Sequence, residues 1–522
     1  MKIWVQAADE YYAKVVADLV RLFFPQFEIV SPVPGNLSDF KDSLPEQNSV
    51  LLQNLAAILS FMEQNVNSET GESLIAVSIQ ADGRKALAQA RLEKPVEGQE
   101  QVNLKRRLMR RLTLQVLQEI TGTEAGPWGI LTGIRPSKVV HRRLDQGWKP
   151  EQIEGELIQE YALDRIKAQL LVEVAQRQRP FLRSGADIPH LVSIYVGIPF
   201  CPSRCLYCSF PSYTWPRKGN LVELFLSALI REIQTVGTEL RRADIGVQSI
   251  YVGGGTPTSL LPEQLSRLLA ALRGNLPIYS WEQWDQSRYG EFTVEAGRPD
   301  TLDAERLEVM KESGVNRLSI NPQTMQDRTL NLIGRKHSAA ETIRAYQLAR
   351  QIGFNCLNMD VILGLPGETA EDVAFTLKTL SKLQPDNLSV HTLAIKRASR
   401  LKEEREQWIL PGTKEVETMS CISQAAAASM GMQPYYLYRQ KNILGNLENV
   451  GYARPGWENI YNIQVMEERQ TIIGLGGGAG SKWVNRQDFT LTNTYNPKDP
   501  QNYVDRIEEI LGKKIDRIRS LG

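Results

Sequence analysis

Three cysteines stand close together in one short segment of the chain. Cys201, Cys205 and Cys208 form the pattern Cys-x3-Cys-x2-Cys directly after an apolar run that is typical of a strand. Thiolates at this spacing can hold one corner of a metal centre from a single loop. A structural zinc ion needs four ligands, but the nearest histidine, His190, precedes that strand, and the sequence has no second Cys-x2-Cys pair. The pattern therefore predicts a [4Fe–4S] cluster on three cysteines, with one iron open to a small molecule.

Six short runs of apolar and β-branched residues follow Leu191, and helical segments separate them. This alternation is typical of β–α units around a parallel sheet. The predicted strands are residues 193–200, 248–254, 291–297, 316–323, 356–367 and 387–395. Six such units make a partial (β/α)6 barrel of the α/β class. Polar residues and glycines stand at the carboxyl ends of these strands, where barrel enzymes carry their chemistry.

Smaller regions are predicted on either side of this barrel. Residues 1–185 are expected to form an α/β and helical domain of unknown role. Its predicted elements are a strand at Lys2–Gln6, a helix at Tyr12–Phe23, a strand at Ser73–Gln80 and a basic helix at 103–120, whose charges suit a solvated face. A linker is expected at Arg183–Pro189, the barrel at 190–430 and a C-terminal region at 431–522.

The composition narrows the class of protein. The 522 residues are 42% hydrophobic and 23% charged, as in folded, soluble chains, and five cysteines are too few for a disulfide framework. The net charge of +1 gives no general attraction to nucleic acid or to an anionic membrane. No apolar run reaches the roughly 20 residues that span a bilayer, and the first residues do not resemble a secretion signal. We therefore expect a cytoplasmic protein without a nucleic acid partner.

The cysteine segment and the motifs that follow it resemble the radical SAM superfamily over about residues 190–480. YVGIPFCPSRCLYCSF and YVGGGTPTSL are similar to the cluster loop and glycine-rich segment of its oxygen-independent coproporphyrinogen III oxidase branch. VEAGRP, INPQTMQDRTLNLIGRKHS, MDVILGLPGET and SVHTLAIK are similar to the successive strand ends of that branch. With LTGIRPSKVVHRRLDQG and YYLYRQKNILGNLENVGYARPG included, the strongest resemblance is to the HemZ group of coproporphyrinogen dehydrogenases.

This resemblance implies a [4Fe–4S] cluster on Cys201, Cys205 and Cys208, and S-adenosylmethionine as the second cofactor. Glycines let the backbone approach the cofactor, carboxylates and amides suit its ribose and sulfonium, and an arginine suits its carboxylate. The residues implied as cofactor contacts are Tyr195, Gly254, Gly255, Thr256, Glu295, Gln323, Arg335, Asp360 and Ala394. Cys356 and Cys421 are expected to be packing residues, and His337 and His391 to be substrate contacts or local hydrogen-bonding groups.

The activity implied is oxidative decarboxylation of coproporphyrinogen III to protoporphyrinogen IX in haem biosynthesis. A 5′-deoxyadenosyl radical would take hydrogen from a propionate, and loss of carbon dioxide and one electron would leave a vinyl group. Flavodoxin or ferredoxin is the expected type of electron donor. Because the porphyrinogen carries four carboxylates, cations are expected near it, and Arg439, Lys441 and Arg454 are the candidates.

Two other functions stay open on the sequence. The best-understood oxidases of the branch have a further cysteine two residues after the third, where this chain has Phe210. The HemW group of haem chaperones shares a phenylalanine there, so a haem carrier is one alternative, although the His-Asn pair and the Tyr-Trp of that group are missing near Tyr461 and Asn462. An iron–sulfur electron-transfer or interaction protein is the other alternative.

Overall fold

The computed structural model describes residues 2–6, 10–24, 28–30, 55–67, 72–81, 84–92, 99–124, 126–182, 190–210, 213–214, 220–279 and 290–521. The chain forms two compact units, Met1–Val172 and Glu173–Gly522. The linker expected at Arg183–Pro189 lies outside the described residues. No helix in the described part of the chain is both long and apolar enough to cross a membrane.

The first unit is built on a five-stranded sheet of order β2-β1-β3-β4-β5. Its strands are β1 (Lys2–Gln6), β2 (Glu28–Val30), β3 (Leu55–Asn67), β4 (Glu72–Ala81) and β5 (Arg84–Leu92), and its helices are α1 (Glu10–Phe23), α4 (Gln99–Thr121), α5 (Ser137–Asp145), α6 (Pro150–Tyr161) and most of α7 (Arg165–Gln178). Alternation along β5 buries Ala86 and Ala88 and exposes Leu87, so one face of the sheet packs on a core that includes Leu117 of α4. The predicted strands at Lys2–Gln6 and Ser73–Gln80 are β1 and β4.

Six parallel strands form the centre of the second unit, in the order in which the sequence predicts them. They are β6 (Leu191–Ile198), β9 (Gly246–Gly254), β10 (Glu291–Glu295), β11 (Arg317–Ser319), β12 (Cys356–Leu363) and β13 (Asn387–Thr392). These strands confirm the predicted α/β fold class with a partial barrel. β12 ends earlier than predicted because Gly364 has a positive φ of 84°, a conformation outside the strand region.

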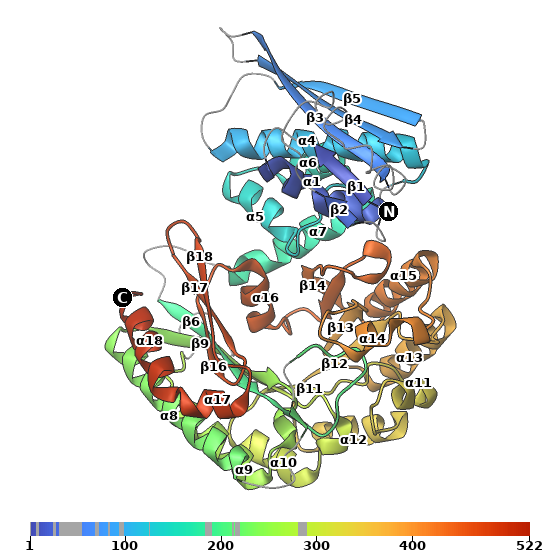
Figure 1. The fold of residues 1–522 in the computed structure, drawn as a ribbon. Coiled ribbons are helices and arrows are strands. Elements are labelled where there is room, and N and C mark those ends of the chain that lie inside the picture. The colour runs from blue at the N-terminus through green and yellow to red at the C-terminus, as the bar shows by residue number, and fades with distance from the viewer. Residues whose placement is uncertain are drawn as a thin grey trace, which may run out of the picture. The chain divides into compact units, whose positions relative to one another are not determined.

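Helices follow each of the first five parallel strands and lie in an arc outside the sheet (Figure 1). They are α8 (Leu221–Arg242), α9 (Pro262–Asn275), α10 (Ala304–Glu312), α11 (Asp327–Leu332), α12 (Ala339–Gln351) and α13 (Ala370–Leu383). The short α14 (Arg400–Glu403) and the longer α15 (Thr413–Ser429) follow β13. The cluster loop leaves β6 through β7 (Phe200–Cys201), which pairs with β8 (Tyr213–Thr214).

The residues after 430 extend the same sheet at both of its edges. β14 (Gln433–Tyr438) and β15 (Asn449–Ala453) run antiparallel beside β13. At the other edge β16 (Ile472–Gly476) pairs parallel with β6, followed by the antiparallel β17 (Gly480–Val484) and β18 (Leu491–Tyr495). Three helices complete the unit: α16 (Ile460–Glu467), α17 (Pro500–Asp505) and α18 (Ile507–Arg519). The 431–522 segment therefore supplies structural strands to the barrel sheet.

A buried carboxylate joins α8 to these C-terminal elements. Glu232 is fully buried, and it accepts hydrogen bonds from Gly476 N at 2.8 Å, Tyr503 Oη at 2.7 Å and the Lys514 ammonium. A buried charge is tolerated when its partners are satisfied, and removing one of them costs about 3–5 kcal/mol. This group therefore fastens the C-terminal helices to the edge of the sheet that holds the cluster loop.

Candidate active site

The three cysteines of the predicted cluster loop line one cavity of about 590 Å³ at the carboxyl ends of the parallel strands. All three are free thiols. Burial raises the pKa of Cys201 to about 11 and also raises that of Cys208, so these thiols need a nearby positive charge, such as iron, to ionise at neutral pH. Among the described residues no three His, Cys, Asp or Glu side chains converge on a single ion.

The glycine-rich segment at the end of β9 packs closely against the cysteine loop. A β-carbon at Gly255 would lie 2.5 Å from Phe200 O and 3.0 Å from Cys201 Sγ, so only glycine fits there. Gly254 has φ of 105°, which other residues rarely adopt. Thr256 Oγ1 lies 3.3 Å from Cys201 Sγ. The segment thus brings bare backbone close to the cluster position.

The strand ends bring the other predicted residues to the same cavity. Gly254, Gly255, Thr256, Glu295, Gln323, Arg335, Asp360 and Ala394 all line it. Tyr195 is not among the lining residues. Its ring lies 6.0 Å from that of Tyr461 and 6.4 Å from that of Tyr251, which does line the cavity. A direct contact between Tyr195 and the cofactor therefore stays a prediction that this packing does not support.

Two carboxylates in the cavity are held in different protonation states. Burial raises the pKa of Glu295 to about 7, although Tyr251 Oη donates a hydrogen bond of 2.6 Å to its Oε1. Burial also opposes ionisation of Asp360, but His391, Asn358 and Ser389 outweigh it and hold its pKa below the usual value. Asn358 Nδ2 donates to Asp360 Oδ1 at 2.7 Å. Asp360 is thus an ionised acceptor, and Glu295 can carry a proton near neutral pH.

Two further side chains keep polar atoms available for a ligand. Arg335 donates to Gly297 O and, at 2.8 Å, to Asn321 O, while its buried Nε has no partner among the described residues. Gln323 has φ of 68°, and its buried Oε1 likewise has no partner in the described part of the chain. Buried polar atoms without partners are costly, so an incoming ligand that bonds to them gains affinity.

Comparisons with known proteins agree with this geometry. The family model described as "Radical SAM superfamily" matches residues 195–380. The oxygen-independent coproporphyrinogen-III oxidase-like protein HemZ of Bacillus subtilis is 44% identical over 408 residues, which is 78% of this chain and 80% of the relative. The chain belongs to the radical SAM superfamily. Within it, the chain belongs to the coproporphyrinogen oxidase-like family near HemZ.

Other members of the superfamily match over shorter lengths. The heme chaperone HemW of Bacillus subtilis is 31% identical over 320 residues, 61% of this chain and 76% of that protein. The solved coproporphyrinogen III oxidase (HemN) of Escherichia coli, described as a radical SAM enzyme, is 25% identical and covers 65% of this chain and 73% of its own, with a TM-score of 0.47. The relatives thus include both oxidases and heme chaperones.

Radical SAM proteins use a [4Fe–4S] cluster and S-adenosylmethionine, and these are the cofactors of this chain. The residues present fit both groups. The free thiols beside Gly255 suit the cluster, and the unpartnered atoms of Arg335 and Gln323 suit the polar parts of the second cofactor. The assignment of each contact to its residue remains a prediction.

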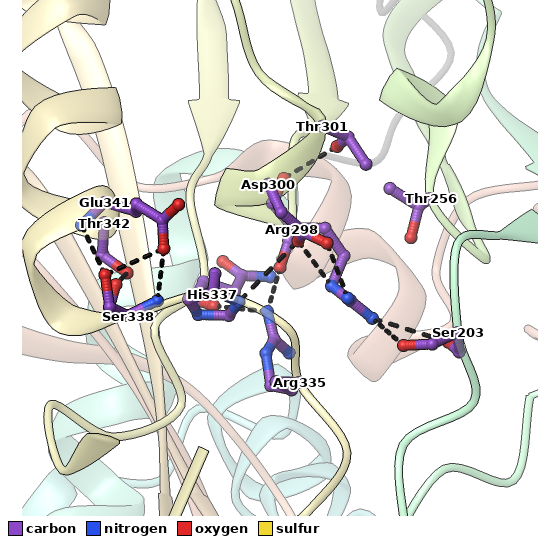
Figure 2. A network of polar contacts seen from close by, with 12 residues as sticks. Ser203, Thr256, Arg298, Asp300, Thr301, Arg335, His337, Ser338, Glu341 and Thr342 are labelled. Carbon is purple, nitrogen blue, oxygen red and sulfur yellow. Dashed lines mark hydrogen bonds and ion pairs between the residues drawn. The ribbon is translucent and has the colours of Figure 1, made fainter. Parts of the chain in front are cut away.

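A buried arginine that sequence reasoning missed joins the cluster loop to the end of β10. Arg298 is 3% exposed and lines the cavity. Figure 2 shows its guanidinium between Asp300, to which it donates two hydrogen bonds of 2.9 and 2.8 Å, and Ser203, whose Oγ lies 2.9 Å from Nη1. Ser203 stands between Cys201 and Cys205, so Arg298 fixes the cluster loop directly. Its signal in the sequence is the Gly-Arg-Pro that ends a predicted strand.

His337 lies behind this arginine without touching the cavity. Its ring is buried, and neither nitrogen has a hydrogen-bond partner within the described ranges. Burial and the neighbouring Arg335 lower its pKa to about 3, so the ring is neutral. Nδ1 lies 3.7 Å from Asp300 Oδ1 (Figure 2). His337 thus neither lines the cavity nor makes a hydrogen bond to a described residue, so neither alternative expected for it is supported, whereas His391 lines the cavity.

The cations expected to meet the substrate are not among the cavity lining. Arg439 is buried, and its guanidinium donates to Asn446 O at 2.9 Å. Arg454 donates to Gln384 Oε1. Lys441 also lies outside the lining. Arg439 and Arg454 are thus bonded to other protein groups. Cys356 is buried as expected, but Cys421 is exposed and is therefore not a packing residue.

Sequence reasoning also missed the part of the cavity that the C-terminal region lines. β14, the segment directly after it, β15 and α16 supply polar and aromatic side chains to the cavity: Tyr436, Tyr438, Gln440, Asn449, Asn462 and Met466. Phe210, from the end of the cluster loop, is 62% exposed and joins the lining. The aromatic run near residue 435 was the available signal for this wall.

Proposed function

We propose that the chain is an oxidoreductase that decarboxylates propionate side chains of coproporphyrinogen III to vinyl groups without oxygen, giving protoporphyrinogen IX in haem biosynthesis. The observation that carries this proposal is the single cavity, which extends from the three thiols to a wall built by the C-terminal region. Its volume of about 590 Å³ is in the range of pockets for large ligands. The 44% identity to a coproporphyrinogen-III oxidase-like protein supports the choice of substrate.

The chemistry divides between the cofactors and the chain. When bound, the cluster and S-adenosylmethionine supply the radical that abstracts hydrogen. Arg298 holds the loop that carries the cysteines, and Arg335, Gln323 and Asp360 offer hydrogen-bonding groups that orient the second cofactor.

The proposed reaction balances for each propionate. The side chain –CH2–CH2–COO⁻ gives up one hydrogen atom from the carbon next to the ring. The C–C bond to the carboxylate then breaks, carbon dioxide leaves, and one electron passes to a one-electron acceptor as –CH=CH2 forms. A flavodoxin- or ferredoxin-type donor supplies the separate electron that cofactor cleavage consumes.

Anaerobic turnover tests the proposal. The reconstituted full chain is incubated with S-adenosylmethionine, reductant, an electron acceptor and coproporphyrinogen III, and tetrapyrroles and 5′-deoxyadenosine are measured by mass spectrometry. Products that lack one or two CO2 units, formed together with 5′-deoxyadenosine, are expected, and Cys205→Ala should form neither. Cofactor cleavage without any decarboxylated tetrapyrrole would exclude this substrate.

A haem carrier is the second candidate, favoured by one observation. Phe210 exposes a large apolar side chain at the cavity, where it could contact a flat macrocycle. A heme chaperone, HemW, is also 31% identical to the chain. Tight, stoichiometric haem binding that is lost in Phe210→Ala, without product formation, would favour the carrier.

A further inference from the structure

One cation in the cavity differs from the others. The lining contains three cationic side chains, Arg298, Arg335 and Lys396. Arg298 is paired with Asp300, and Arg335 donates to two backbone carbonyls. For Lys396, no hydrogen bond or ion pair joins the ammonium to any residue that the structure describes. Both arginines therefore have partners within the protein, Arg335 through all but its Nε, whereas Lys396 has none among the described residues.

The surroundings of Lys396 make an unpaired ammonium energetically unfavourable. The side chain is half-buried, and burial lowers its pKa with no neighbouring acid to offset the effect. A cation withdrawn from water without a counter-charge is unfavourable until an anion enters. The site therefore favours a negatively charged ligand over a neutral one.

The backbone on both sides of Lys396 is fixed, which holds the base of this side chain in place. Ile395 N donates to Asn442 O at 3.0 Å, and Lys396 O accepts from Ser399 N at 3.1 Å and from Ser399 Oγ at 2.7 Å. The segment that follows is tied to the cluster loop, since Arg204 Nη2 donates to Ala398 O at 2.6 Å and Leu401 N to Leu206 O at 2.9 Å. An anion bound to Lys396 would thus lie within the cavity on a strand end that is braced against the cluster loop.

We propose that Lys396 is the carboxylate-recognition residue for the substrate, pairing its ammonium with one propionate so that the porphyrinogen takes one orientation in the cavity. This inference rests on the proposed function for the identity of the substrate. Tyr438 and Gln440 line the same cavity and offer neutral hydrogen-bonding groups for the rest of the macrocycle. Lys396 replaces Arg439, Lys441 and Arg454 as the cation that meets the substrate.

Binding measurements separate this role from a cofactor contact. The reconstituted full chain is titrated anaerobically with coproporphyrin III, a fluorescent tetracarboxylate, and with its tetra-amide, in which every carboxylate is neutral. Lys396→Ala should weaken tetracarboxylate binding by about 10- to 100-fold, as expected for one charge-assisted hydrogen bond, and should leave tetra-amide binding unchanged. Lys396→Arg should restore most of the affinity. Lys402→Ala, an exposed lysine of the same segment outside the cavity lining, should behave like the unmodified chain.

Three results decide the outcome. Unchanged tetracarboxylate affinity in Lys396→Ala, or no tetracarboxylate binding by the unmodified chain, overturns the inference. Weaker S-adenosylmethionine binding in the same variant, with porphyrin affinity unchanged, also overturns it, because Lys396 would then contact the cofactor. Lys396-dependent binding of the tetracarboxylate without any decarboxylated product supports the inference and instead contradicts the proposed decarboxylase function.

Discussion

The two walls of the cavity are organised differently. On the cluster side, Arg298, Arg335 and Asp360 are held by hydrogen bonds to other protein groups. On the C-terminal side, strands and a helix present tyrosines and amides. Lys396, on a segment tied to the cluster loop, has no partner among the described residues. Side chains that hydrogen bonds within the protein already hold are preorganised for a ligand, and the buried atoms of Arg335 and Gln323 that have no partner among the described residues can bond to it. The difference indicates where specificity within the family can change without loss of the shared chemistry.

The largest effect on the cluster side is expected when one of the three thiols is removed. Cys201→Ala, Cys205→Ala or Cys208→Ala should abolish the cluster, because each sulfur binds a different iron. Iron content and the visible absorption of the reconstituted protein measure this. Cys356→Ala and Cys421→Ala are the matched controls and should keep full iron content. Loss of the cluster in either control would contradict the assignment.

Arg298→Gln should weaken the cluster side without removing a ligand. The change leaves the Asp300 carboxylate without its partner and releases Ser203, at a cost of about 3 kcal/mol for a buried pair. We expect lower thermal stability of the apo chain. We also expect faster loss of iron in air, which the visible absorption of the cluster measures. Arg328→Gln, which breaks an exposed pair with Asp372, is the control and should change neither rate. Equal iron loss in both variants would show that Arg298 does not hold the loop.

Changes to the predicted cofactor contacts should separate binding from cluster assembly. Gln323→Ala and Asp360→Ala should each weaken S-adenosylmethionine binding by roughly 5- to 150-fold, the effect of one lost buried hydrogen bond, while iron content stays normal. Equilibrium dialysis with the labelled cofactor measures the affinity. Normal affinity in both variants would exclude this surface as the cofactor site.

Changes on the C-terminal side of the cavity should weaken substrate binding and leave cofactor binding unchanged. Tyr438→Phe removes the 3.3 Å contact between its hydroxyl and His391 Nδ1, worth about 1 kcal/mol, and leaves the ring in place. We expect the KM for the tetrapyrrole to rise about 5-fold with no change in cofactor affinity. If cofactor affinity falls instead, the two walls do not divide the ligands between them.

Glu295 should give an effect of a different kind, a pH dependence of stability. Its pKa of about 7 in the folded chain exceeds the usual value of a carboxyl, so between those two values the folded state keeps a proton that the unfolded state has lost. The free energy of unfolding should therefore fall as pH rises through this window to about 7. Denaturant titrations of the apo chain at several pH values should show a weaker fall in Glu295→Gln. An identical slope in both proteins would mean that Glu295 is ionised throughout.

Much of the cluster side could be predicted from the sequence, because its residues follow strand ends at fixed positions. The three cysteines, Glu295 and Asp360 each come directly after or within a short apolar run, so the β–α pattern alone places them at one edge of the sheet. Tyr195 shows the limit of this reasoning, since alternation along β6 sets the face on which its ring lies.

The cation that lines the cavity could not be predicted in the same way, because the candidate cations differ in their partners and not in their sequence surroundings. Arg439 and Lys396 both follow apolar strands, yet the first is satisfied by Asn446 and only the second keeps its charge available to the cavity. In the first unit, β3 escaped prediction because polar residues interrupt its apolar positions.

The parallel pairing of β16 with β6 has a consequence for how the protein is made. Ser193 Oγ, on the strand that leads into the cluster loop, donates a 2.6 Å hydrogen bond to Gln470 Oε1, and these residues are 277 positions apart. Since synthesis proceeds from the N-terminus, one edge of β6 stays unpaired until β16 has been synthesised. An unpaired edge is a site for aggregation, so a nascent chain that ends before residue 470 exposes the strand that leads into the cluster loop.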